Sequence, residues 1–146
     1  MLLGFFMDYL ELGYLGLFLV CFLSATILPL ASEAVVLAFL YYNYDPIWVL
    51  IIATLGNTLG GVTNYLLGML GKTKTLKKYI KNEEKWSRTE KRIEKYGIWL
   101  GLITWLPFIG DPLTIVLGFF RVKFIPLFFL MLLGKGLRYA VIVFLW

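Results

Sequence analysis

The sequence predicts an all-α polytopic membrane protein, and two observations carry that prediction. Hydrophobic residues make up 60% of the 146 residues and aromatic residues 18%, and the mean hydropathy is +0.82. Apolar residues also gather in four blocks, each long enough to reach across roughly 30 Å of hydrocarbon at about 1.5 Å per helical residue. The blocks lie at about residues 12–42, 47–71, 97–120 and 124–146, so we expect a single membrane domain over 1–146 without a soluble domain.

The first block, 12–42, is interrupted near its centre. The run LPLASE places Pro29, Ser32 and Glu33 among residues that are otherwise apolar enough to cross a bilayer. Proline removes a backbone hydrogen bond, and an ionisable group near the bilayer centre costs at least about 2.5–3.5 kcal/mol on insertion scales. We therefore expect a broken hairpin here instead of a continuous helix.

The second block, 47–71, predicts a full span with one face of small and amide side chains. Residues three and four apart share one side of a helix, and here they are Gly56, Asn57, Gly60, Gly61, Asn64 and Gly68. For the glycines we favour close helix packing. For Asn57 and Asn64, packing and contact with a bound phosphate are both left open.

The segment between the second and third blocks is strongly basic. Residues 72–95 hold ten of the fourteen Lys and Arg residues against four Glu. The positive-inside bias places this connector, 72–96, in the cytoplasm. It either lies on the anionic inner leaflet or forms a solvated helix. Because topology already accounts for the net charge of +5, we do not expect a nucleic-acid partner.

The third block, 97–120, carries a second break. The run LPFIGDP holds Pro107, Gly110, Asp111 and Pro112, and Pro112 suits the first position of a returning helix. Buried irregular backbone of this kind must be shielded by other helices or line a wet cavity. The two breaks therefore indicate a site.

Charge in the short loops decides between four simple crossings and two re-entrant hairpins. With four crossings, Arg121 and Lys123 would lie outside, against the positive-inside bias. If 12–42 and 97–120 instead enter and return on the same side, both residues join the basic segment 72–95 inside. We therefore expect re-entrant hairpins.

One constant shift in residue number relates the two halves of the chain. It aligns Pro29 with Pro107 and Glu33 with Asp111 without a gap. Each half then consists of a broken hairpin and a full span. The predicted fold is an inverted repeat: 12–71 (hairpin 12–42, span 47–71) and 97–146 (hairpin 97–120, span 124–146).

The fourth block, 124–146, carries two basic residues on one helix face, Lys135 near the centre and Arg138 three positions on. Four ionisable groups then lie at membrane depth and must be paired, protonated or wet. We expect Glu33, Asp111, Lys135 and Arg138 to share one site at the midplane. Two alternatives remain: the acids cap the returning half-helices, or the four charges only form ion pairs.

Metal and redox chemistry are not expected. The chain has one cysteine, Cys21, and no histidine, so it lacks the usual ligands of a transition metal. We expect no cofactor.

The motifs SATILPLASEAVVLAF, GNTLGGVTNYLLG, TWLPFIGDPLTIVLGFFRVKF and GKGLRY together resemble the YqaA branch of the DedA (VTT, or SNARE-associated) membrane proteins, over nearly the whole chain. The resemblance implies an inner-membrane protein with two opposed re-entrant hairpins, linked in that family to flipping polyprenyl-phosphate or phospholipid carriers and to the proton motive force. Better-studied members carry arginines just after the second hairpin's proline. Here Asp111 stands in that region, an acid in place of a base.

We therefore expect a flippase or scramblase that moves a phosphate-bearing lipid and is coupled to protons, with Lys135, Arg138, Asn57 and Asn64 binding the phosphate and Glu33 and Asp111 exchanging the proton. The partners would be an anionic lipid and the membrane, and a homodimer is compatible with the small chain. We do not expect this protein to be an enzyme. Two rival functions are a non-transporting membrane-homeostasis or assembly factor and an intramembrane lipid pyrophosphatase.

Overall fold

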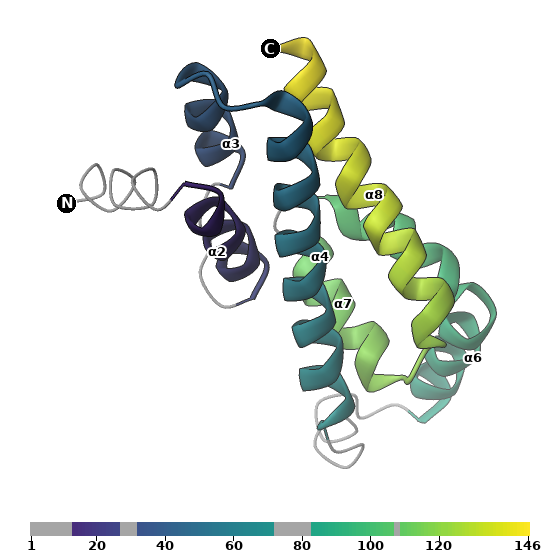
Figure 1. Cartoon of the computed structure of the whole chain (residues 1–146). Coiled ribbons are helices and arrows are strands. Elements are labelled where there is room, and N and C mark those ends of the chain that lie inside the picture. The colour runs from purple at the N-terminus through teal and green to yellow at the C-terminus, as the bar shows by residue number, and fades with distance from the viewer. Residues whose placement is uncertain (1–12, 27–31, 72–82, 107–108) are drawn as a thin grey trace.

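The structure is a computed structural model that describes residues 13–26, 32–71, 83–106 and 109–146. In these four ranges the chain is helical and forms no strand, which confirms the predicted all-α class (Figure 1). The helices are α2 (Tyr14–Thr26), α3 (Ser32–Tyr41), α4 (Pro46–Met69), α6 (Glu83–Leu100), the 3-10 helix η1 (Gly101–Trp105), α7 (Gly110–Phe119) and α8 (Phe124–Leu145).

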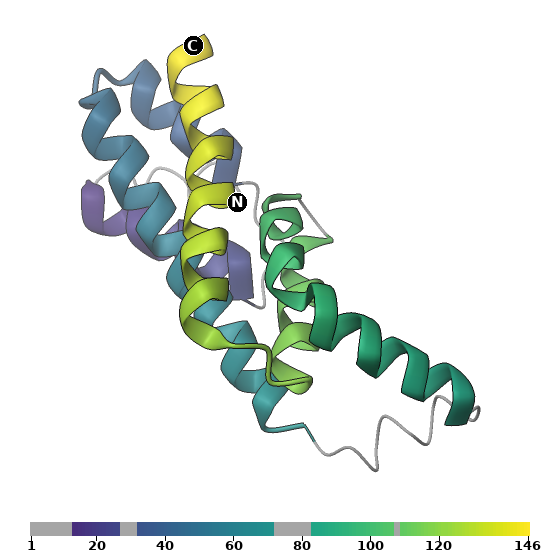
Figure 2. The ribbon, with the colours of Figure 1, turned by 90° about the vertical axis from the view of Figure 1, so that its right-hand side faces the viewer.

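Helices α4 and α8 are, within the described ranges, the two that are long and apolar enough to cross a membrane. They have 24 and 22 residues, so they are about 36 Å and 33 Å long. They lie side by side and run in opposite directions (Figures 1 and 2). The carboxylate of Asp45 accepts a hydrogen bond of 2.9 Å from the amide of Ile47 and starts α4. Both helices agree closely with the predicted spans 47–71 and 124–146.

Helix α2 packs on α4 through glycines. A Cβ atom at Gly56 would lie 2.7 Å from the backbone oxygen of Phe18, and one at Gly60 would lie 2.6 Å from that of Phe22. No larger side chain fits without separating the helices. The favoured interpretation of these two glycines as packing residues is confirmed.

Helix α7 approaches the other end of α4 in the same way. A Cβ atom at Gly68 would meet the backbone oxygen of Ile115, and one at Gly118 would meet that of Tyr65. The two backbones therefore touch from both sides, so α7 is held firmly against α4.

The turns in the two halves match at the shift in residue number that the sequence predicts. This shift separates the first residues of α3 and α7, and it also separates the first residues of α4 and α8. The turns between them contain Asn43 (φ 65°) and Arg121 (φ 54°), which correspond under the same shift. The amide of Asn43 donates to the oxygen of Leu40 at 3.1 Å, and the amide of Arg121 donates to that of Gly118 at 3.0 Å. The same local geometry thus recurs in both halves.

Two hydrophobic cores lie at opposite ends of the α4–α8 pair. One joins α2, α3, the start of α4 and the end of α8, and includes Phe39 and Val143. The other joins α6, α7, the end of α4 and the start of α8, and includes Leu117 and Leu127. The centres of α4 and α8 lie between these cores, and there the polar residues gather.

Helix α6 extends across the expected end of the basic connector. Helix α6 begins at Glu83 and continues to Leu100, so no helix boundary falls at 96/97. Its buried residues Trp86 and Ile93 pack beside the α7–α8 turn, with the Trp86 ring centroid 5.5 Å from that of Phe120. Helix α6 therefore packs on the protein through these residues, and its contact with the inner leaflet stays a prediction.

Candidate functional site

The centre of the molecule holds a buried lysine between an amide and an acid. Lys135 is at the middle of α8 and only 1% exposed. Its Nζ donates to Oδ1 of Asn57 at 2.6 Å and lies 3.4 Å from Oδ1 of Asp111. Asn57 is at the middle of α4, and Asp111 is in the first turn of α7. Three helices thus meet at one ammonium group.

Arg138, one turn further along α8, forms the second half of the cluster. Its Nε lies 3.5 Å from Oε1 of Glu33 in the first turn of α3. Its Nη2 donates to the hydroxyl of Tyr139 at 3.0 Å and lies 3.5 Å from Oδ1 of Asn57. The four predicted charges therefore come together as two ion pairs, and Asn57 contacts both bases.

Asn57 also fixes α2 to the cluster. Its Nδ2 donates to the backbone oxygen of Cys21 at 3.1 Å and lies 3.3 Å from Oγ of Ser24. The side chain thus uses its oxygen for the bases of α8 and its nitrogen for α2. Removing this amide would disturb both contacts.

Asn64 does not join the cluster. Its Nδ2 donates to the backbone oxygen of Ala25, so it ties α4 to the end of α2. Its Oδ1 is buried and has no hydrogen-bond partner among the described residues. The geometry thus separates Asn57 from Asn64, which the sequence treated alike.

Tyr139 belongs to the site, although sequence reasoning missed it. Its hydroxyl lies 2.8 Å from Oγ of Ser32 and accepts the bond from Arg138, and the side chain is fully buried. Ser32 is thereby part of a polar chain that joins α3 to α8. A signal was present, because Tyr139 follows Lys135 by four residues and so lies on the same face of α8.

The second break also differs in detail from its prediction. Helix α7 begins at Gly110, so Pro112 is its third residue and not its first. That position is still in the first turn, where a missing N–H loses no intrahelical bond. Ile109 is the N-cap and supplies no side-chain hydrogen bond, while Asp111 faces Lys135. Pro29 and Pro107 lie outside the described residues, as does the residue before α3.

The cluster is electrically balanced but unevenly buried. Two carboxylates face two bases, so the fully ionised cluster is neutral. The Lys135 side chain is 1% exposed and that of Arg138 13%, whereas Asp111 is 30% and Glu33 37% exposed. The bases are therefore less exposed than the acids, and both acids reach an accessible surface from which a proton can arrive.

A pocket of about 290 Å³ gives access to the site from outside. It is lined by Leu102 of η1 and by Gly134, Leu137, Arg138 and Val141 of α8. Arg138 is the only charged residue among these, so an anion in this apolar pocket would meet a guanidinium. Among the described residues there is no group of three His, Cys, Asp or Glu side chains that could hold a metal ion.

Helices α4 and α8 are long and apolar enough to cross a membrane, and α8 carries paired charges near its centre, where ionisable residues of a membrane helix must find partners. Residues 28–146 match the family model of the VTT domain. The chain therefore belongs to the DedA/VTT family of membrane proteins, within its YqaA branch, as the sequence motifs predicted.

Three relatives support this assignment. Over 132 residues the chain is 36% identical to inner membrane protein YqaA of Escherichia coli (strain K12). The aligned region covers 90% of this chain and 89% of the relative. The same values hold for inner membrane protein YqaA of Shigella flexneri. An uncharacterized protein of Haemophilus influenzae (strain ATCC 51907 / DSM 11121 / KW20 / Rd) is 31% identical over 137 residues, 88% of this chain and 84% of that protein. None of these names describes an enzyme, and no solved structure matches the chain.

Proposed function

We propose that this chain moves a phosphate-bearing lipid between the two leaflets of the inner membrane. The observation that carries the proposal is the cluster itself. Two bases, the buried Lys135 and the partly buried Arg138, lie near the centre of α8, and Arg138 opens into an apolar pocket. Placing charges at that depth is costly, and a guanidinium binds phosphate strongly where water is excluded. A lipid phosphate, in the form of a phospholipid or a polyprenyl phosphate, fits both features.

The transport mechanism rests on an inverted repeat. The matched turns of the two halves and the opposite directions of α4 and α8 support it. Helices α2, α3 and α7 have 13, 10 and 10 residues, too few to cross about 30 Å of hydrocarbon, which supports re-entrant hairpins. Rocking of one half against the other would open the site to each leaflet in turn.

Proton coupling follows from the charge balance. With both acids ionised the cluster is neutral and has little attraction for a phosphate. Protonation of Glu33 or Asp111 leaves an excess positive charge on Arg138 and Lys135, and the phosphate neutralises it. Proton and lipid therefore favour each other's binding. The accessible acids and the buried bases support this division of roles.

The orientation in the membrane follows from the basic residues. The start of α6 packs beside the α7–α8 turn, so Arg121 and Lys123 lie near the basic connector. We propose that this end is cytoplasmic and that α4 and α8 both cross the bilayer.

A non-transporting role in membrane homeostasis remains the second candidate, because the ion pairs are closed and hold α3, α7 and α8 together. Leaflet-resolved lipid transport in proteoliposomes, with and without a pH gradient, separates the two. Arg138→Gln is expected to lower transport at least tenfold, whereas Arg121→Gln, at an exposed turn, should leave it nearly unchanged. Equal rates for the two variants and the wild type would favour the structural role.

A further inference from the structure

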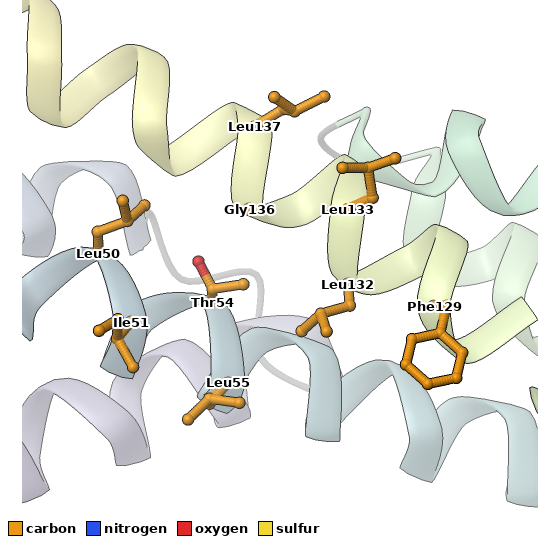
Figure 3. Close-up of a pocket in the computed structure, with 9 residues that line it drawn as sticks. All are labelled: Leu50, Ile51, Thr54, Leu55, Phe129, Leu132, Leu133, Gly136 and Leu137. Carbon is orange, nitrogen blue, oxygen red and sulfur yellow. The ribbon is translucent and has the colours of Figure 1, made fainter. Parts of the chain in front are cut away.

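Among the described residues that line the two pockets beside α8, Arg138 is the one that is charged. The smaller pocket, already described, joins Arg138 to apolar side chains. A larger pocket of about 670 Å³ lies between α4 and α8, and its nine lining residues carry no charge (Figure 3). Leu137 lines both pockets. The place at which an anion can bind along this part of α8 therefore depends on where the guanidinium of Arg138 is held.

The side chain of Tyr139 contacts this guanidinium in two ways. Its hydroxyl accepts the hydrogen bond of 3.0 Å from Nη2, and the centroid of its ring lies 4.8 Å from Cζ of Arg138. A cation over an aromatic ring is attracted more strongly where water is excluded. Neighbours in sequence do not normally face each other on a helix, so the convergence of these two side chains is a specific feature of the site.

Tyr139 is itself fixed from α3. The residue is fully buried, and its hydroxyl lies 2.8 Å from Oγ of Ser32, which is also buried. Because a guanidinium can only donate, the hydroxyl oxygen accepts from Arg138 and its hydrogen is available to Ser32. Arg138, Tyr139 and Ser32 thus join α8 to α3 without a carboxylate.

Glu33 of α3 holds the same guanidinium mainly by its charge. Its Oε1 lies 3.5 Å from Nε of Arg138, which is too far for a strong hydrogen bond. The attraction is lost when the carboxylate is protonated. A tyrosine hydroxyl keeps its proton near neutral pH, so the contact between Tyr139 and Arg138 does not depend on that change.

The other titratable groups near Arg138 are placed so that they do not replace Glu33. Asp111 of α7 is paired with Lys135 of α8, and Cys21 of α2 is fully buried. Helix α4 presents the amide of Asn57 at 3.5 Å, but its Oδ1 is shared with Lys135 at 2.6 Å. Helix η1 presents the apolar Leu102.

We infer that Tyr139 is a positioning residue, which holds the Arg138 guanidinium at its pocket when Glu33 is protonated and no longer attracts it. The inference rests on the proposed function and adds a residue to the regulation of its site. Without Tyr139, the long side chain of Arg138 turns toward water once Glu33 is neutral. The importance of Tyr139 therefore depends on the charge of Glu33.

Modification of Arg138 by phenylglyoxal tests this without a ligand, in the full-length protein in detergent and with peptide mass spectrometry as the readout. Tyr139→Phe should raise the rate several-fold in combination with Glu33→Gln, and change it little in alkaline buffer when Glu33 is present. Ser32→Ala keeps the hydroxyl of Tyr139 but removes its anchor, so it should act in the same direction. Tyr65→Phe is the matched control, because the buried hydroxyl of Tyr65 donates to the backbone oxygen of Val122 in the other core.

Binding of dihexanoylphosphatidylglycerol gives a second readout, because the charge of this phosphodiester does not change with pH. In the Glu33→Gln protein, Tyr139→Phe should weaken binding at least about tenfold, the lower end of the range for a hydrogen bond to a charged group. Equal effects of Tyr139→Phe with and without Glu33→Gln would overturn the inference, since a merely structural role does not depend on that charge. The expected labelling without lipid binding or transport would refute only the proposed function, and lipid binding without that labelling would refute only the role of Tyr139.

Discussion

Lys135 is the most deeply buried charge among the described residues, and its surroundings predict unequal mutational costs. The change Asp111→Asn leaves the ammonium group of Lys135 beside amide oxygens, without a compensating charge. Lys135→Met instead leaves a carboxylate that is 30% exposed and can be solvated. Breaking a buried pair costs about 3–5 kcal/mol when the remaining charge stays buried. We therefore expect Asp111→Asn to cost about 2–4 kcal/mol and Lys135→Met clearly less.

Unfolding of the purified variants in detergent, followed by tryptophan fluorescence, measures these costs. The double variant with Asp111→Asn and Lys135→Met should be no less stable than Asp111→Asn alone, because the uncompensated charge of Lys135 is removed. Equal costs for the two single changes would mean that the lysine is not charged in the folded protein.

At Glu33 the expected effect is on pH dependence. Phosphate binding should strengthen as pH falls, because protonating either acid takes the cluster from neutral to cationic. Glu33→Gln fixes one neutral side chain at nearly constant volume, so binding at high pH should rise toward its low-pH value. Lipid binding measured over a pH series tests this expectation.

Asp111→Asn should act in the same direction, and the double variant should lose most of its pH response. Close coupling makes the two changes non-additive. If lipid binding has the same midpoint pH in the wild type, in both single variants and in the double variant, the two acids act only as structural ion-pair partners.

At the scale of elements, the contact between α4 and α7 depends on glycines that leave no room for a methyl group. Gly68→Ala places a Cβ against the backbone of Ile115, which cannot move aside as a side chain can. We expect it to cost about 1–3 kcal/mol or more. Gly61→Ala is the control, because its Cβ would lie 3.5 Å from Cε of Lys135, an ordinary contact.

Gly61→Ala should be neutral or slightly stabilising, since alanine favours helix by up to about 1 kcal/mol over glycine. Thermal unfolding of both variants in the same detergent decides the matter. A larger loss for Gly61→Ala than for Gly68→Ala would contradict the close packing of α7.

At the scale of the whole molecule, the proposed topology places the two matching turns on opposite sides of the membrane. Tyr42 lies in the α3–α4 turn and Lys123 in the α7–α8 turn, and both are exposed. A cysteine at Tyr42 should react with an impermeant reagent applied to intact spheroplasts, and one at Lys123 should react only after lysis. Lys123 is chosen over its neighbour Val122 because Val122 is buried. The native Cys21 is fully buried, so it should not react with the reagent.

Labelling of Lys123→Cys from outside intact spheroplasts would refute re-entrance of the third block. Labelling of both positions from the same side would refute the inverted repeat.

Much of this arrangement could be predicted from the sequence because its signals are local. Proline and acid at matching positions indicated the constant shift in residue number that also separates the starts of α3 and α7. A three-residue spacing put Lys135 and Arg138 on one helix face. The opposed orientation of the two halves in the membrane stays a prediction.

Other features depend on tertiary packing and could not be predicted. Asn57 and Asn64 occupy similar positions on α4, and only contact with α8 distinguishes them. Tyr139 was not among the predicted site residues, and only the folded chain brings its hydroxyl within 2.8 Å of Oγ of Ser32 in α3. Helix α6 runs past 96 because its Lys, Arg and Glu residues favour helix and Gly97 does not break it.

The contact between Asn57 and Lys135 has an evolutionary consequence. These residues hold corresponding places in the two halves, and they touch each other at 2.6 Å. Two identical half-length chains joined about a two-fold axis would bring each such residue against its own copy, as a pair of repelling lysines or a pair of amides. Joining both halves in one gene removes that restriction, because each copy can diverge. The complementary pair of a donor and an acceptor at the centre would prevent either half from assembling with itself in the same way.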